Sequence, residues 1–252
     1  MKKKKIILFL LVFALLIALA ACSKSEKSQG SEAADTAVSE SLNAENMQKE
    51  ADLLAEALRL QNEPADDYVI QANDFSMSRA LFENRVQSVM LSGVSREDAE
   101  QNVLNYVVVQ TLYHAALNAG VTIDEAQFQQ DTASARQQLE TAMAEDETAG
   151  GSRYELTKVF LDALEANGIK EDYWSLLAEY DRMQVTILQY TRMLHDNNYI
   201  GQGYSTDDQA GYLQYCLDVT RGEMEAQNVQ FAPDIQWELN GLNYHYYLWP
   251  EL

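Results

Sequence analysis

Neighbouring carboxylates are the residues of this sequence whose type and spacing could do chemistry, because a paired acid and base can shuttle protons in a hydrolase. Such groups occur at Glu97-Asp98, Asp124-Glu125, Glu145-Asp146-Glu147, Glu171-Asp172 and Asp207-Asp208. All of them stand at predicted helix starts or in a predicted loop, where capping and the helix dipole account for acids. An exposed first turn lacks the burial that raises the pKa of a general acid. The sequence therefore predicts that the protein is not an enzyme.

Histidine and cysteine give no metal or cofactor site. His114, His195 and His245 are far apart in the sequence and lack metal-ligand spacing. We find no nucleophile triad signature and no glycine-rich phosphate loop, so no cofactor is predicted. Cys216 falls within an apolar helical pattern and is expected to be a small buried side chain.

Cys22 directly follows a predicted export signal. Lys2 to Lys5 are followed by the apolar run Ile6 to Ala18 and by small residues, which together predict a secretory signal peptide over residues 1–21. The segment Leu19-Ala20-Ala21-Cys22 resembles the lipobox of bacterial lipoproteins. The resemblance implies lipidation of Cys22 with a diacylglyceryl group, cleavage before it, and palmitate-type acyl chains that hold the protein on the extracytoplasmic face of the cell membrane.

Residues 22–45 are predicted to be a flexible tether. The stretch Ser23 to Ser41 is rich in Ser, Glu, Lys and Ala, and its single large apolar residue is Val38. It cannot offset its ordering entropy by burial, and it would reach roughly 25 Å as a random coil.

The charge excludes whole classes of partner. Removing Lys2 to Lys5 lowers the basic count from 18 to 14 against 39 acids, so the net charge changes from −21 to −25. Such an acidic chain is not expected to bind nucleic acid or anionic lipid head groups.

Hydrophobic spacing predicts a mainly α-helical domain over residues 46–196 with a short hairpin. The hairpin runs from Tyr68 to Phe75 around Asn73-Asp74. The predicted helices run from Met47 to before Pro64, from the cap Ser78 to Ser92, from the cap Ser95 to Ala119, from a capping box at Thr122 and Glu125, from Leu156 to Leu164, and from Glu171 to His195. The helix after Thr122 carries a narrow apolar seam, which is typical of a projecting arm.

Residues 197–252 are predicted to add a helix and a second hairpin that pack on this domain. The helix begins near Asp207, capped by Ser205 or Thr206. The strands Ile235 to Leu239 and Leu242 to Leu248 alternate apolar and polar residues around Asn240-Gly241.

The order of these elements resembles the N-terminal chaperone domain of the SurA and PrsA families, which is related to the peptide-binding region of trigger factor. The resemblance covers Tyr68 to His195 and rests on Ala119 to Glu125 and on Phe160 to Tyr173. The turn Asn73-Asp74 departs from the Asn-Gly common in relatives. Because only 57 residues follow His195, the parvulin isomerase domain of those families does not fit.

The resemblance implies a chaperone-like protein that binds unfolded or newly secreted polypeptides without prolyl isomerase activity. The candidate client-binding side chains are Tyr173, Trp174 and Tyr180. Their helical spacing favours a place in the core, and Trp174, which lies off the main apolar stripe, is the expected exception. The alternative is a non-catalytic envelope lipoprotein with one specific folded partner. A hydrolase is the third hypothesis.

Overall fold

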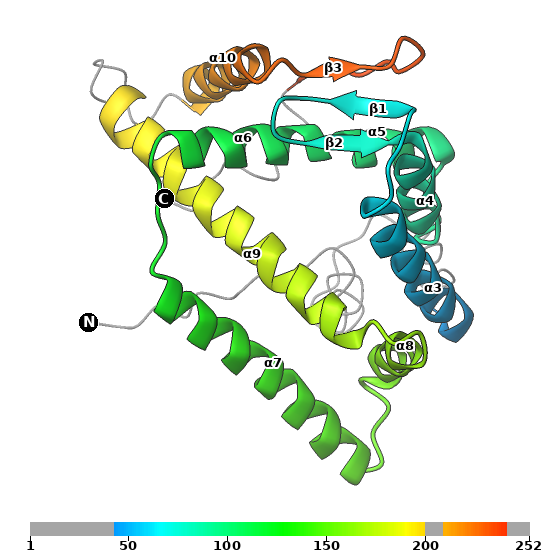
Figure 1. Cartoon of the computed structure of the whole chain (residues 1–252). Helices are drawn as coiled ribbons and strands as arrows, with labels where there is room; N and C mark the ends of the chain where they lie inside the picture. The colour runs from blue at the N-terminus through cyan, green and yellow to red at the C-terminus, as the bar shows by residue number, and fades with distance from the viewer. Residues whose placement is uncertain (1–42, 200–208, 241–252) are drawn as a thin grey trace, which may run out of the picture. The chain divides into compact units, whose positions relative to one another are not determined.

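The computed structural model describes residues 43–199 and 209–240 (Figure 1). Cys22, the predicted tether up to residue 42, Ser205, Thr206 and the strand Leu242 to Leu248 lie outside the described residues. Within them the chain is mainly α-helical with a small three-stranded antiparallel sheet, which confirms the predicted fold class. No helix of this part is long and apolar enough for a membrane crossing.

The elements follow one another in the order expected over most of the chain. They are α3 (Ala44–Gln61), β1 (Tyr68–Gln71), β2 (Ser76–Ser78), α4 (Arg79–Met90), α5 (Arg96–Leu104), α6 (Tyr106–Asn118), α7 (Glu125–Thr148), α8 (Glu155–Ala166), α9 (Lys170–Met193), the π-helix η1 (Leu194–Tyr199), α10 (Gln209–Ala226) and β3 (Gln230–Phe231).

The contacts divide the chain into two compact units that do not follow chain order. Within the described residues, unit 1 contains 43–58, Ser88–Val94 and Asp124–Asp181. Unit 2 contains Arg59–Gln87, Ser95–Ile123 and the remainder from Arg182 onward. The long helix α9 therefore contributes residues to both units.

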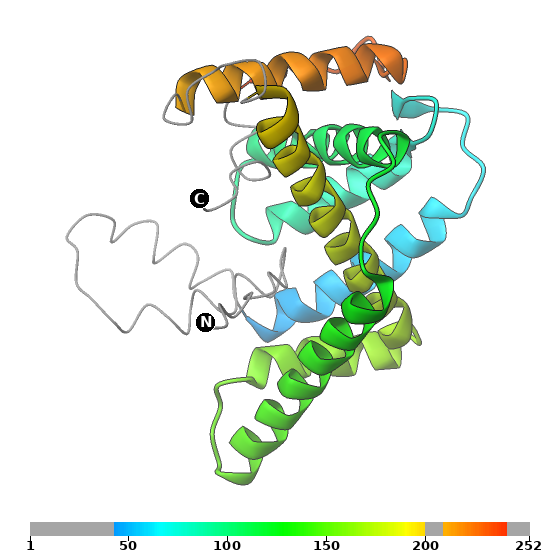
Figure 2. The ribbon, with the colours of Figure 1, turned by 90° about the vertical axis from the view of Figure 1, so that its left-hand side faces the viewer.

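Unit 1 packs around one apolar cluster. Its buried members come from α3, α8 and α9 and are Met47, Ala51, Phe160, Leu161, Ala163, Leu164 and Trp174. Leu139 and Met143 of α7 pack against this cluster while remaining partly exposed. Phe128 is the buried residue of α7, so the narrow seam predicted for this helix is confirmed. The ribbon of α7 can be followed in green in Figure 2.

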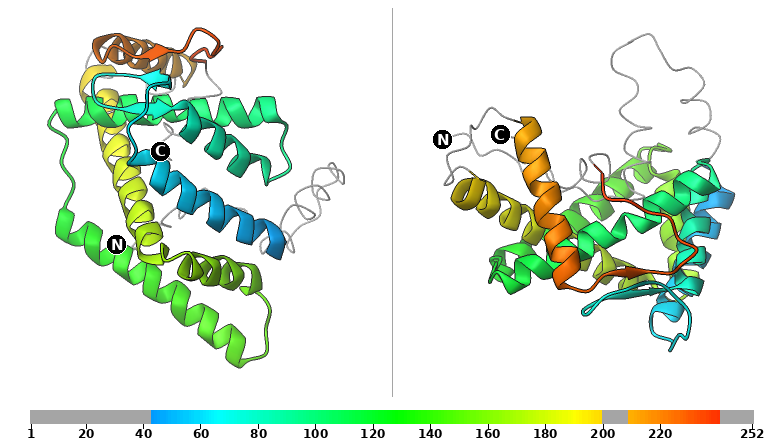
Figure 3. Two further views of the ribbon diagram at one scale, coloured as in Figure 1. Left: turned by 45° about the vertical axis from the view of Figure 1, so that its right-hand side comes forward. Right: turned by 90° about the horizontal axis from the view of Figure 1, so that it is seen from above.

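Unit 2 is built around α6 and the sheet. Six consecutive residues of α6, Val107 to Leu112, are buried, as expected for a helix that is apolar on both faces. The helix α10 packs against α6. In the sheet, β1 lies between β2 and β3, with Ile70 opposite Met77 on one side and Phe231 on the other (Figure 3).

The predicted hairpin is confirmed, and glycines end the helices as expected. The backbone N–H of Ala72 donates to the carbonyl of Phe75 at 2.9 Å and closes the turn at Asn73-Asp74. Gly120 and Gly168 have φ angles of 77° and 72°, a left-handed conformation that a residue without Cβ adopts without strain.

The single helix predicted from Ser95 to Ala119 is wrong at one position, because α5 and α6 are separated at Asn105. There the N–H of Val108 donates to the carbonyl of Asn105, three residues back, at 3.0 Å. The side chain of Asn105 accepts a hydrogen bond from Trp237 Nε1 at 3.0 Å. This partner lies too far along the chain for periodicity to reveal it.

The capping box predicted at Thr122 is also wrong. The structure begins α7 at Glu125 with Asp124 as its N-cap, and the Asp124 carboxylate accepts from the Gln127 N–H at 3.1 Å. The Asp124 carboxylate, two residues after Thr122, is the cap that the helix uses.

A cap substitution tests this assignment. We expect Asp124→Ala to lower the free energy of unfolding by about 1 kcal/mol, because it removes a bond to an N–H that the helix cannot otherwise satisfy. Thr122→Ala is the matched control and is expected to change stability by less than about half that amount. Urea denaturation of both variants measures the difference, and equal losses would contradict the assignment of Asp124.

Two further boundaries differ from the expectation. Glu145 to Thr148 continue α7 instead of forming a loop. Residues 235–240 carry no strand in the described part of the chain. They lie along α5, where Gln101 Nε2 donates to the carbonyl of Gln236 at 3.1 Å.

Candidate functional site

Two of the three predicted client-binding side chains lie together in the apolar cluster of unit 1. The ring of Tyr173 meets the ring of Phe160 edge-on, with centroids 5.3 Å apart. The ring of Trp174 lies at the same centroid distance on its other side. Tyr180 is half-buried farther along α9 and is not a member of this cluster.

Arg136 of α7 covers Trp174. Its guanidinium carbon lies 5.0 Å from the centre of the indole ring, a cation–π geometry. The same guanidinium donates two hydrogen bonds to Glu171, at 2.7 and 2.8 Å, and one to Glu140 at 2.9 Å. These bonds raise the pKa of Arg136 and lower the pKa of Glu171, so both groups stay charged and the contact persists at any physiological pH.

Burial limits what this cluster offers to a ligand. The expectation that Trp174 is the exception to a core position is wrong, because its ring is only 9% exposed within the cluster. Its Nε1 has no hydrogen-bond partner among the described residues. Tyr173 is half-buried, and burial followed by the nearby charge of Glu50 raises the pKa of its phenol. The rings therefore contribute mainly to the packing of α3, α7, α8 and α9.

The exposed large apolar side chains of unit 1, within its described residues, are Met90 and Val94. Met90 is 39% exposed and Val94 36%. They lie four residues apart at the end of α4, where the Gly93 N–H donates to the carbonyl of Met90 at 3.0 Å. We call residues 89–94 the apolar tip. The sequence analysis did not identify this segment. The signal for it was that apolar residues continue up to Gly93, which ends the helix, and resume directly after it at Val94.

Two contacts hold the apolar tip against the start of α3. The Ser88 hydroxyl lies 2.7 and 2.8 Å from the two carboxylate oxygens of Glu50, a buried acid. The Asn46 amide donates to the carbonyl of Leu91 at 3.4 Å. The tip is therefore fixed next to the residues at which the predicted tether ends.

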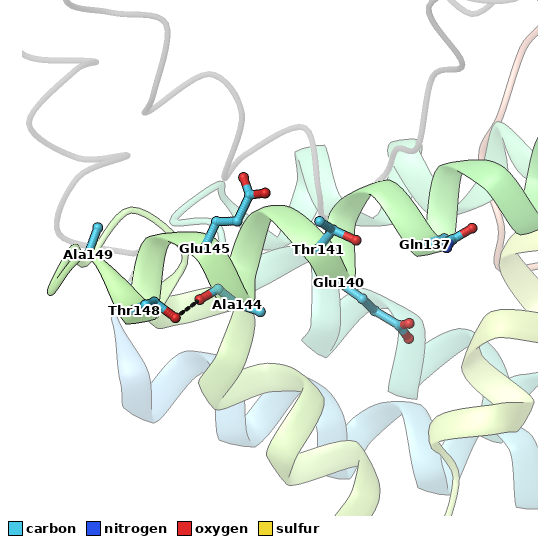
Figure 4. A pocket seen from close by; sticks show the side chains of 7 residues that line it. All are labelled: Gln137, Glu140, Thr141, Ala144, Glu145, Thr148 and Ala149. Atoms are coloured by element: carbon cyan, nitrogen blue, oxygen red, sulfur yellow. Dashed lines mark hydrogen bonds between the residues drawn. The ribbon is translucent and has the colours of Figure 1, made fainter.

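A hollow of about 640 Å³ runs along α7 within unit 1 (Figure 4). Its described lining comes from successive turns of this one helix and consists of Gln137, Glu140, Thr141, Ala144, Glu145, Thr148 and Ala149. The Thr148 hydroxyl donates to the Ala144 carbonyl at 2.8 Å. No second element faces these side chains among the described residues of the lining, so the hollow does not arrange groups for chemistry.

Most of the paired acids lie at helix starts, as predicted. Glu97-Asp98 and Glu171-Asp172 are exposed in the first turns of α5 and α9. Asp207-Asp208 lies outside the described residues. Among the described His, Cys, Asp and Glu residues, no group of three or more could hold a metal ion. Cys216 is buried, as expected.

Asp181 is a second buried acid, besides Glu50, that the sequence did not single out. It is 5% exposed, and its Oδ2 has no hydrogen-bond partner among the described residues. Burial raises the pKa of this carboxyl to about 6. The acid sits in the middle of α9, where helical neighbours in the sequence are a mixture of apolar and polar residues and give no sign of burial.

Asp181 predicts a pH-dependent stability. Because its pKa is higher in the folded than in the unfolded chain, the protonated acid stabilises the fold, and this stabilisation is lost as the pH rises through about 6. We expect Asp181→Asn to be more stable than the wild type by about 2 kcal/mol at pH 7.5. The difference should vanish near pH 4, and urea denaturation at both pH values measures it. A constant difference would contradict the burial of a charged carboxylate.

The comparisons with known proteins add no relative: no protein-family model, no curated protein and no solved structure matches this chain.

Proposed function

We propose that this chain is a lipid-anchored extracytoplasmic protein that holds unfolded or newly secreted polypeptides and lacks prolyl isomerase activity. Its partners are such polypeptides and, through the acyl chains on Cys22, the membrane. The order of elements from β1 to α9 supports the proposal, because it is the order expected from the resemblance to the SurA and PrsA chaperone domains.

The observation that carries the proposal is the apolar tip. Met90 and Val94 both expose apolar surface within this short segment, and methionine adapts its shape to varied partners. The surrounding chain is strongly acidic, which keeps a protein with exposed apolar side chains soluble. The contact between the tip and the start of α3, next to the residues at which the predicted tether ends, supports a role close to the membrane.

The energies fit transient holding. Burying the exposed part of Met90 or Val94 yields roughly 1 kcal/mol each. Two such contacts bind a client weakly and release it readily, and they do not depend on a particular client sequence. A tight binder of one folded partner needs a much larger interface.

Photo-crosslinking in intact cells tests the proposal. A photoreactive amino acid replaces Met90, and the matched control carries the same group at exposed Gln137 on α7. We expect the probe at residue 90 to capture many different polypeptides and the probe at residue 137 to capture few. Equal capture from both positions would contradict the assignment of the apolar tip.

The same experiment separates the two functions raised by the sequence. One dominant crosslinked species that survives purification would favour the envelope protein with a single folded partner. Many weak species favour a holding chaperone. No capture from residue 90 would remove the support for either role of the tip.

A further inference from the structure

A second hollow lies in unit 2 and has a different character. It has a volume of about 340 Å³ and is formed where the β1–β2 hairpin meets the end of α10 and the start of β3. Its lining consists of Tyr68, Gln71, Ala72, Asn73, Ser76, Asn228 and Gln230. Every polar group in this lining is an amide or a hydroxyl. We call it the amide hollow.

The elements that line the amide hollow are fixed to one another. The Asn73 N–H donates to the carbonyl of Gln227 at 2.9 Å, which ties the hairpin turn to the end of α10. In the sheet, Gln71 of β1 lies opposite Ser76 of β2 on one side and opposite Gln230 of β3 on the other. Asn228 has a φ of 55°, a left-handed conformation that asparagine tolerates after a helix end. The lining is therefore held in place before any ligand arrives.

Much of its hydrogen-bonding capacity is open. Within the described residues the side chains of Tyr68, Gln71 and Ser76 make no hydrogen bond. The amide of Gln230 donates to Asn228 Oδ1 at 3.2 Å, which orients its carbonyl oxygen away from that bond. Each carboxamide presents a donor and an acceptor in one plane, the pattern that matches neighbouring hydroxyls or an acetamido group.

The charge of the lining selects the class of ligand. The hollow contains no Lys, Arg, Asp or Glu, although the sequence carries 57 such residues counting both signs, 18 basic and 39 acidic. An anion would find no cation there, and a metal ion would find no carboxylate. An unfolded polypeptide binds through apolar side chains, whereas the side chains of this lining other than Tyr68 and Ala72 are polar amides and a hydroxyl. A neutral polyhydroxylated molecule needs neither a charged partner nor an apolar surface, because it binds through hydrogen bonds to amides and hydroxyls.

We propose that the amide hollow binds a neutral oligosaccharide. The amides of Gln71 and Gln230 hydrogen-bond its hydroxyl or acetamido groups. Because the hollow is open and its side chains are hydrated in the free protein, binding is weak, with a Kd of about 1 mM. This site is separate from the apolar tip and does not depend on the holding of polypeptides.

Titration followed by amide NMR shifts tests this site in the mature chain from residue 22, carrying Cys22→Ala in place of the lipid. The probe is the trimer of N-acetylglucosamine. We expect saturable binding that weakens at least about tenfold in Gln71→Ala/Gln230→Ala. Both side chains are exposed, so the fold is preserved, and unchanged far-ultraviolet circular dichroism verifies this. The control Gln137→Ala removes an exposed glutamine in unit 1 and should bind as the wild type does.

Three results would overturn the proposal. The first is no saturable shift at about 10 mM trimer. The second is binding that the double substitution leaves unchanged. The third is preferential binding of a neutral unfolded peptide or of an acidic trisaccharide, either of which would assign the hollow to another ligand class. None of these results bears on client capture by residue 90.

Discussion

Cys22→Ala is expected to move the protein from the membrane to the soluble fraction almost completely. Two acyl chains on one cysteine anchor a protein stably, because each buried CH₂ contributes ~0.8 kcal/mol. Detergent phase partitioning of cell extracts measures the distribution, with the wild type expected in the detergent phase.

The second cysteine provides a matched control. Cys216 is buried in α10, so Cys216→Ala should leave the protein in the detergent phase while removing the same thiol chemistry. Mass spectrometry of the wild type should place the acyl chains on Cys22 as the first residue. Membrane retention of Cys22→Ala would show that another segment anchors the protein and would remove the basis for the lipoprotein assignment.

Trp174→Ala is expected to destabilise unit 1 by about 3–5 kcal/mol. The indole is nearly buried in the cluster that α3, α8 and α9 form, and deleting a large buried aromatic leaves a cavity. The substitution also removes the ring beneath the Arg136 guanidinium, a contact of about 1 kcal/mol. Urea denaturation monitored by circular dichroism gives the change in midpoint.

Trp174→Phe separates packing from ligand contact. Phenylalanine retains most of the apolar ring, and the indole N–H has no hydrogen-bond partner to lose among the described residues. We therefore expect a loss of only about 1–2 kcal/mol and unchanged client binding. If Trp174→Ala kept wild-type stability but lost client capture, the ring would be a client surface and its role in packing would be refuted.

Local patterns in the sequence predicted the helices and the first hairpin. The spacing of Met47, Ala51 and Leu54 reports the buried face of α3, and Gly120 and Gly168 mark helix ends through a conformation that other residues rarely adopt. The turn at Asn73-Asp74 was found because its chemistry lies within four residues. Each of these signals is local, so one sequence is enough to read it.

Contacts between distant segments could not be predicted. The strand β3 exists because Phe231 pairs with Ile70 of β1. A strand of two residues is too short to show an alternating pattern in the sequence. The bond between Trp237 and Asn105 marks the break between α5 and α6. The burial of Asp181 and the exposure of Met90 likewise depend on which faces meet in three dimensions, which periodicity along one helix does not specify.

Suppression of aggregation by the purified mature chain tests most directly whether this protein holds unfolded polypeptides. Two unrelated denatured proteins are diluted into buffer with one equivalent of the mature chain carrying Cys22→Ala, and light scattering is followed. We predict that scattering falls for both clients and that Met90→Glu/Val94→Glu removes most of this effect, while Gln137→Glu, with one added exposed charge, does not. Undiminished scattering of both clients in the presence of the folded mature chain would contradict the proposed function.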